Sequence, residues 1–132
     1  MSNKTPNLEA FNEKIAAFFD THQKIIAEFR ISMENSQNFL ELAKLSAERE
    51  PENTVDMLEQ IKEIDLFGHL SRQFDVFQEV AGAIPKNSED PNIQLQLEKF
   101  EDFEKQYEDL LEEAESQLEL LEQLLAQLIG NA

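Results

Sequence analysis

The chain has 132 residues, a net charge of −17 at pH 7, no Cys, three Gly and four Pro. The absence of Cys excludes disulfide bonds and thiolate metal sites. The acidic balance argues against direct binding to nucleic acid or to anionic membranes, because both are polyanions. The length suits one domain, and the abundance of Glu, Leu, Gln, Lys and Ala is typical of helices. We therefore expect a single all-α domain over residues 1–132.

The sequence contains no signal for a membrane or for secretion. No apolar stretch approaches the ~20 residues that a membrane-spanning helix needs. The first twenty residues lack the basic start and the apolar block of a secretory signal peptide. We therefore expect a soluble, cytoplasmic protein.

Residues 6–49 form the first predicted helix, which starts after Thr5 at Pro6. Its apolar residues follow helical spacing strongly up to Met33, and the same face includes Leu40. Between Ser32 and Asn38 the same face becomes polar, so a kink there is an alternative to the continuous helix that we prefer. Beyond this stretch the apolar seam is predicted to resume with Phe39, Leu42, Ala43 and Leu45.

Residues 52–83 form the second predicted helix, which follows Glu50 and Pro51. Proline is favoured at the first helical position, where its missing N–H has no partner to lose. The apolar positions change register near Gly68, and a glycine in a helix interior costs about 1 kcal/mol relative to Ala. The sequence therefore predicts either a helix kinked at Gly68 or two shorter helices that meet there, which would give four helices in all.

Residues 91–129 form the third predicted helix, which starts after Asp90 at Pro91 and is followed by Gly130. At 1.5 Å per residue it would be roughly 58 Å long. A helix of that length cannot bury its apolar stripe alone, so the other helices must lie alongside it. The predicted architecture is an elongated antiparallel bundle of three long helices.

The acidic charge is concentrated in this last helix. Residues 87–132 carry two Lys and 13 Asp or Glu, a net charge of −11, and no basic residue follows Lys105. Carboxylates recur one helical turn apart, which is typical of a solvated face and permits at most weak bridging by a divalent cation. As a functional alternative, we predict that this face binds a protein partner with a basic surface, through Glu108, Glu112, Glu115 and Glu119.

Glu104 interrupts the apolar seam of the same helix. We expect its side chain either to reach solvent or to pair with Lys14, Lys24 or Lys62 on a neighbouring helix.

The leucines near the C-terminus cover more than one face of the helix. Two explanations remain open: burial on two sides by the first and second helices, or a surface for self-association or partner docking. The second explanation predicts a homo-oligomer. The residues concerned are Leu120, Leu121, Leu124, Leu125 and Leu128.

Residues that could support catalysis are few. His22 occupies a position in the apolar seam, where a buried, hydrogen-bonded imidazole is the more common arrangement. His69 lies one helical turn after Asp65. This spacing allows the two side chains to form an ordinary acid–histidine pair or to bind a metal ion together. With two His and no Glu-x-x-His, the di-iron bundle pattern cannot be assembled, and no Gly-rich loop could hold a phosphate. We expect no enzyme activity, no catalytic residue, no cofactor and no metal site.

The leading hypothesis is a non-enzymatic helical protein–protein interaction protein, such as an adaptor, a chaperone or an inhibitor, which uses the acidic and leucine-rich faces of the C-terminal helix. The alternative is a DNA-mimic inhibitor that occupies a nucleic-acid-binding protein. A further alternative is an amphipathic coat protein on a neutral lipid or polymer surface.

Overall fold

The computed structural model of the chain describes residues 4–86 and 89–130. It contains four helices: α1 (Lys4–Ser46), α2 (Pro51–Ile64), α3 (Leu66–Gly82) and α4 (Pro91–Gly130). The described residues include no β-strand, so the prediction of an all-α fold is confirmed.

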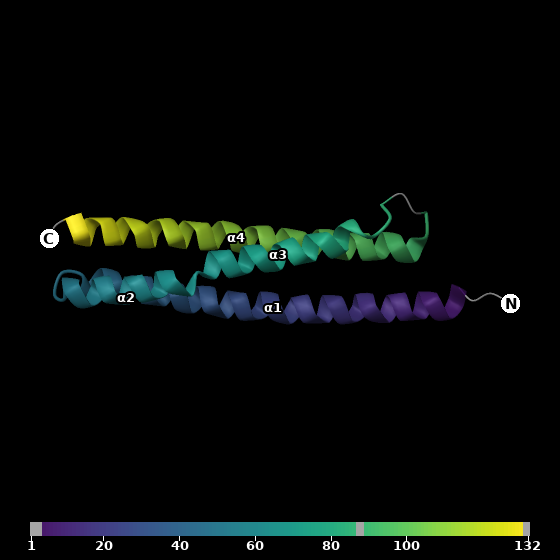
Figure 1. The fold of residues 1–132 in the computed structure, drawn as a ribbon, viewed down its shortest axis with the longest axis horizontal. Coiled ribbons are helices and arrows are strands. Elements are labelled where there is room, and N and C mark those ends of the chain that lie inside the picture. The colour runs from purple at the N-terminus through teal and green to yellow at the C-terminus, as the bar shows by residue number, and fades with distance from the viewer. Residues whose placement is uncertain (1–3, 87–88, 131–132) are drawn as a thin grey trace.

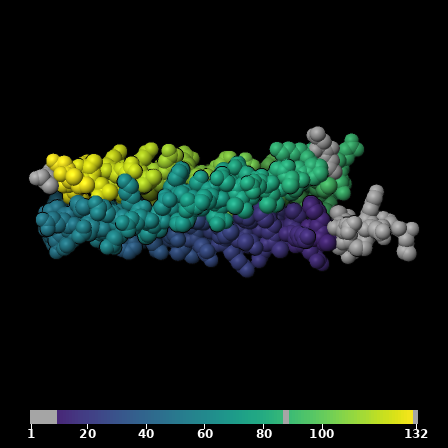
Figure 2. All heavy atoms as spheres, viewed as in Figure 1, coloured from purple at the N-terminus to yellow at the C-terminus, as the bar shows by residue number. Residues whose placement is uncertain are grey.

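The helices form an elongated antiparallel bundle, as predicted. α2 and α3 together run back along α1, and α4 returns beside them, so that the C-terminal end lies next to the α1–α2 turn (Figure 1). In Figure 2, α2 and α3 lie across one face of the molecule between α4 and α1. The second of the three predicted helices is therefore present as two consecutive segments.

α1 is continuous through the region where a kink was the alternative. It is 43 residues long, and α4 follows closely with 40. The turn after α1 is closed by hydroxyl groups: Ser46 Oγ lies 2.7 Å from Thr54 Oγ1, and Thr54 is buried. α2 then begins at Pro51, where the sequence predicts a helix start.

The break between α2 and α3 occurs at Asp65, three residues before the predicted position at Gly68. Asp65 adopts the left-handed conformation (φ 53°, ψ 53°), which ends α2. Its carboxylate then accepts a hydrogen bond from the Gly68 N–H at 3.2 Å and so caps α3. A Cβ atom at Gly68 would lie 2.2 Å from Asp65 Oδ2, so glycine provides the space for this cap.

Two apolar clusters form the core, one on each side of the break. The larger joins α1, α3 and α4, where the ring of Phe77 lies 5.3–5.5 Å from the rings of Phe18, Phe100 and Tyr107. The smaller joins α1, α2 and α4, and its buried members are Leu40, Ala43, Leu58, Leu121 and Leu125. α3 packs in the larger cluster and α2 in the smaller one. The break at Asp65 lets each helix take the direction that its own cluster requires.

Beyond residue 38, the predicted apolar face of α1 is correct only in part. Leu40 and Ala43 are buried there, whereas Phe39, Leu42 and Leu45 are exposed. The sequence offers two apolar faces in this part of the helix, about half a turn apart. The face that includes Leu40 is the one that meets the smaller cluster.

Candidate functional site: the acidic edge of α4

α4 is held in place by buried residues that face the other helices. They recur at intervals of three, four or seven residues, which keeps them on one side of the helix. They are Gln96, Phe100, Tyr107, Leu110, Ala114, Leu121 and Leu125. The opposite side of α4 is consequently free to carry polar groups.

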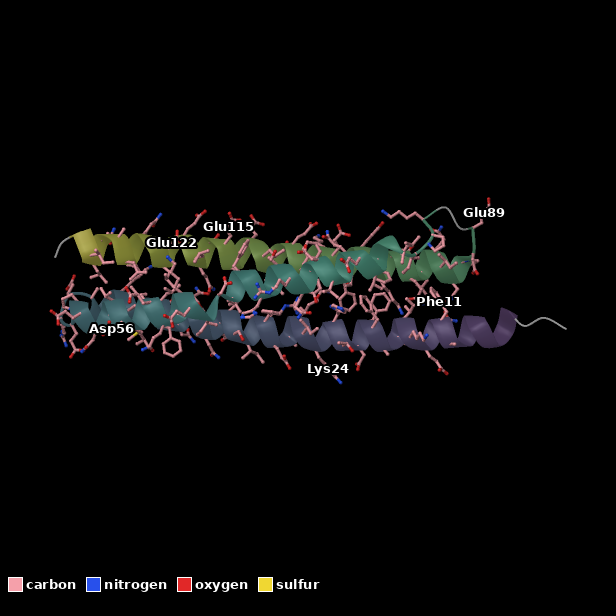
Figure 3. All side chains as sticks on the ribbon, in the orientation of Figure 1. Phe11, Lys24, Asp56, Glu89, Glu115 and Glu122 are labelled. Carbon is pink, nitrogen blue, oxygen red and sulfur yellow. The ribbon has the colours of Figure 1, made fainter. Side chains whose placement is uncertain are left out.

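The four predicted partner-binding carboxylates, Glu108, Glu112, Glu115 and Glu119, occupy this opposite side, and we call them the acidic edge. All four are exposed. Figure 3 shows Glu115 pointing away from the bundle. From Glu108 to Glu119 the row extends for about 16 Å, at one residue per 1.5 Å of helix. The structure therefore brings the four side chains together in one solvent-facing row.

No cation neutralises this row within the described side chains. The ion pairs there join Lys24 to Asp20 within α1, and Lys62 of α2 to Glu122 of α4 at 3.9 Å. Glu122 lies one turn beyond the acidic edge, and its side chain remains half exposed. The acidic edge is thus a row of unpaired carboxylates in water.

Glu104 lies apart from the acidic edge. It is half-buried and lines an open groove between α3 and α4, together with Gln78 and Lys86. The predicted ion pair with Lys14, Lys24 or Lys62 is not formed among the described side chains. Lys24 and Lys62 pair with nearer carboxylates instead.

The five C-terminal leucines divide into two groups. Leu121 and Leu125 are buried in the smaller cluster between α1 and α2, so they belong to the core of the chain and are not available to a partner. Leu120, Leu124 and Leu128 are half-buried around that cluster. Burial by the other helices is therefore the explanation that applies to Leu121 and Leu125. A docking role stays a prediction only for Leu120, Leu124 and Leu128.

His22 is buried, and its Nδ1 atom lies 2.5 Å from the hydroxyl oxygen of Tyr107 on α4. Burial lowers the pKa of His22 from its usual 6.5, which keeps the imidazole neutral, so its Nδ1 can accept a hydrogen bond from the tyrosine hydroxyl. Burial likewise raises the pKa of Tyr107 to about 12. This hydrogen bond links α1 to α4, and the rings of Phe18 and Phe77 pack against His22. Sequence reasoning missed Tyr107 as the partner, although a tyrosine in an apolar seam requires one.

His69 is exposed and lies at the surface of α3. Its Nδ1 atom is 2.9 Å from a guanidinium nitrogen of Arg72, while the carboxylate of Asp65 caps α3. Across the described part of the chain, no three His, Cys, Asp or Glu side chains are arranged to hold a metal ion.

Gln117 is a half-buried polar residue that sequence reasoning did not single out. Its Nε2 donates to the Met33 carbonyl oxygen at 3.1 Å, whereas its Oε1 has no partner. It borders a cavity of about 30 Å³ beside the α2–α3 break, which Ser36 and Asp65 also line. This volume holds one or two water molecules at most, so the cavity is not a substrate site.

Comparison with known proteins provides no further assignment. No protein-family model, curated protein sequence or solved structure matches this chain. None of the helices in residues 4–86 and 89–130 combines the length and apolarity needed to cross a lipid bilayer. The functional argument therefore depends on the residues of the chain itself.

Proposed function

We propose that this chain is a non-enzymatic interaction protein that binds a basic surface of a protein partner through the acidic edge of α4. The observation that carries the proposal is the row of four exposed, unpaired carboxylates on one continuous 40-residue helix.

The net charge of the chain is larger than solubility requires, and most of it is on the C-terminal segment. A net charge of about 2–8 in magnitude is enough for a small domain, and this chain carries −17. Like charges four residues apart also destabilise a helix by a few tenths of a kcal/mol per pair. A row of such pairs therefore has a cost in stability, and a partner of opposite charge would offset it.

Opposite charges act mainly on the rate at which two proteins associate, and salt weakens the effect. The test is to reverse Glu108, Glu112, Glu115 and Glu119 to Lys and to measure association with a partner captured from the native host. We expect association to slow by about tenfold at low salt, while circular dichroism stays helical.

A control variant should reverse four exposed carboxylates on α2 and α3 instead, which changes the net charge equally: Glu59, Glu63, Asp75 and Glu79. We expect a smaller effect from it, because these residues lie outside the acidic edge. Equal effects of the two variants, or indifference to salt between about 0.05 and 0.5 M, would mean that the acidic edge is only a solvated surface.

The DNA-mimic hypothesis is a special case of the same binding mode. It requires in addition that DNA and the acidic edge compete for one site on the partner, which salt-dependent displacement of DNA would test. The coat hypothesis relied on a wide leucine face, and two of those leucines lie in the core. We therefore do not propose it.

A further inference from the structure

The outward face of α1 carries large apolar side chains in its C-terminal half. Ile31 is 60% exposed, Phe39 49%, Leu42 55% and Leu45 76%. Single apolar residues on a surface are ordinary, whereas a contiguous group is characteristic of an interaction site. Here four of them lie within 15 residues of one helix.

Their spacing is that of a coiled-coil seam. Ile31, Asn35, Asn38, Leu42 and Leu45 follow one another at steps of four, three, four and three residues, and all five are exposed. We call these five residues the α1 seam. They lie opposite the residues that pack into the core, such as Met33 and Leu40. A polar Asn at a seam position is a known means of fixing the register of a paired helix, and Asn35 and Asn38 occupy two such positions here.

The borders of the α1 seam are unequal in charge. Glu34 and Glu41 lie one heptad apart along one border, each directly before a seam residue, and both are exposed. Ser32, Phe39 and Ser46 follow the other border. Two cations lie beside the acidic border: Arg30 donates to Gln106 Oε1 at 3.0 Å and lines a groove with Glu34 and Asp109, and Lys44 lines a groove with Glu41 and Glu113. Carboxylates outnumber cations along this border, whereas the border of Ser32, Phe39 and Ser46 is uncharged.

This charge pattern argues against a second copy of the chain as the occupant. In an antiparallel pair the two acidic borders would face each other, and in a parallel pair each would face the uncharged border of the partner. Neither arrangement provides an opposite charge, and each copy carries a net charge of −17. A partner helix that carries Lys or Arg beside its apolar residues would cover the α1 seam and also place an opposite charge next to Glu34 and Glu41.

We propose that the α1 seam docks an amphipathic helix of another protein, with apolar residues at heptad spacing and basic residues flanking them. This surface is separate from the acidic edge. Lys24, one heptad before Ile31, points away from the bundle on the side opposite Glu115 (Figure 3). The inference is therefore independent of the proposed function, and substitutions can test the two surfaces one at a time.

The test uses the full chain and two synthetic helical peptides of about three heptads, with Leu at the seam positions and either Lys or Glu at the flanking positions. Binding is measured by fluorescence anisotropy. We expect the Lys peptide to bind, with an affinity that decreases as salt rises, and the Glu peptide to bind at least about tenfold more weakly. The double variant Leu42→Glu, Leu45→Glu should lose at least about tenfold in affinity for the Lys peptide.

A matched control carries Val76→Glu and Ile129→Glu, two exposed apolar residues away from the α1 seam, and should bind the Lys peptide as the wild type does. The variant Glu34→Lys, Glu41→Lys should transfer the preference to the Glu peptide. The proposal is overturned if the Lys peptide binds the Leu42 and Leu45 variant as tightly as the wild type, since charge alone would then explain binding. It is also overturned if neither peptide binds, or if light scattering shows a wild-type dimer that this variant dissociates.

Discussion

Truncation of Leu121 is the sharpest test of how the smaller cluster packs. Leu121 is 3% exposed and packs with Leu40, Ala43 and Leu58 in the smaller cluster. Replacing a buried Leu by Ala typically costs 2–5 kcal/mol, from lost burial and from the cavity that remains. The smaller cluster has only five buried members and half-buried neighbours that can relax, so we place Leu121→Ala at about 2–3 kcal/mol.

The matched control is Leu45→Ala, because the same atoms are removed from a side chain that is 76% exposed. Surface substitutions of this kind usually change stability by less than about 0.5 kcal/mol. The free energy of unfolding would be obtained for both variants from urea titrations followed by circular dichroism. The two transitions should have similar slopes and different midpoints.

Two results would refute this reasoning. The first is a loss of less than about 1 kcal/mol for Leu121→Ala, which would place this side chain outside a packed core. The second is a midpoint that rises with protein concentration for the wild type and not for the variant. In that case Leu121 would be buried between copies of the chain, as the self-association hypothesis requires.

Two further predictions concern pH and the helix break. Because burial lowers the pKa of His22, the unfolded chain binds this proton more readily, so stability is full above about pH 6.5 and decreases as pH falls below it. His22→Leu should flatten that decrease between about pH 6.5 and 5 in urea titrations, and an unchanged slope would exclude His22 as its source. Asp65→Ala should cost about 1–2 kcal/mol, because it removes the cap on α3 and places Ala in a left-handed conformation. Asp65→Asn, which tolerates that conformation and can still cap, should cost less than Asp65→Ala in the same titration, and equal losses would contradict this account.

The sequence alone determined those features that follow from local rules. Pro51 and Pro91 mark the starts of α2 and α4, because proline fits the first turn and Asp90 can accept the N–H of Asn92 there. The helical periodicity established the all-α bundle and its three antiparallel passes. The row of carboxylates on α4 likewise follows from spacing, since residues three or four apart share one face of a helix whatever packs behind it.

The tertiary structure decided which of several apolar faces lies inside. Periodicity shows that α1 has apolar residues on two sides beyond residue 38, but only contact with α2 and α4 makes Leu40 a core residue and leaves Leu42 exposed. The same applies to Leu121 on α4. The hydrogen bond between His22 and Tyr107 joins residues 85 positions apart, and no local pattern contains that pairing. The physical reason is that burial depends on which helices meet, and their meeting is set by the packing of the whole bundle.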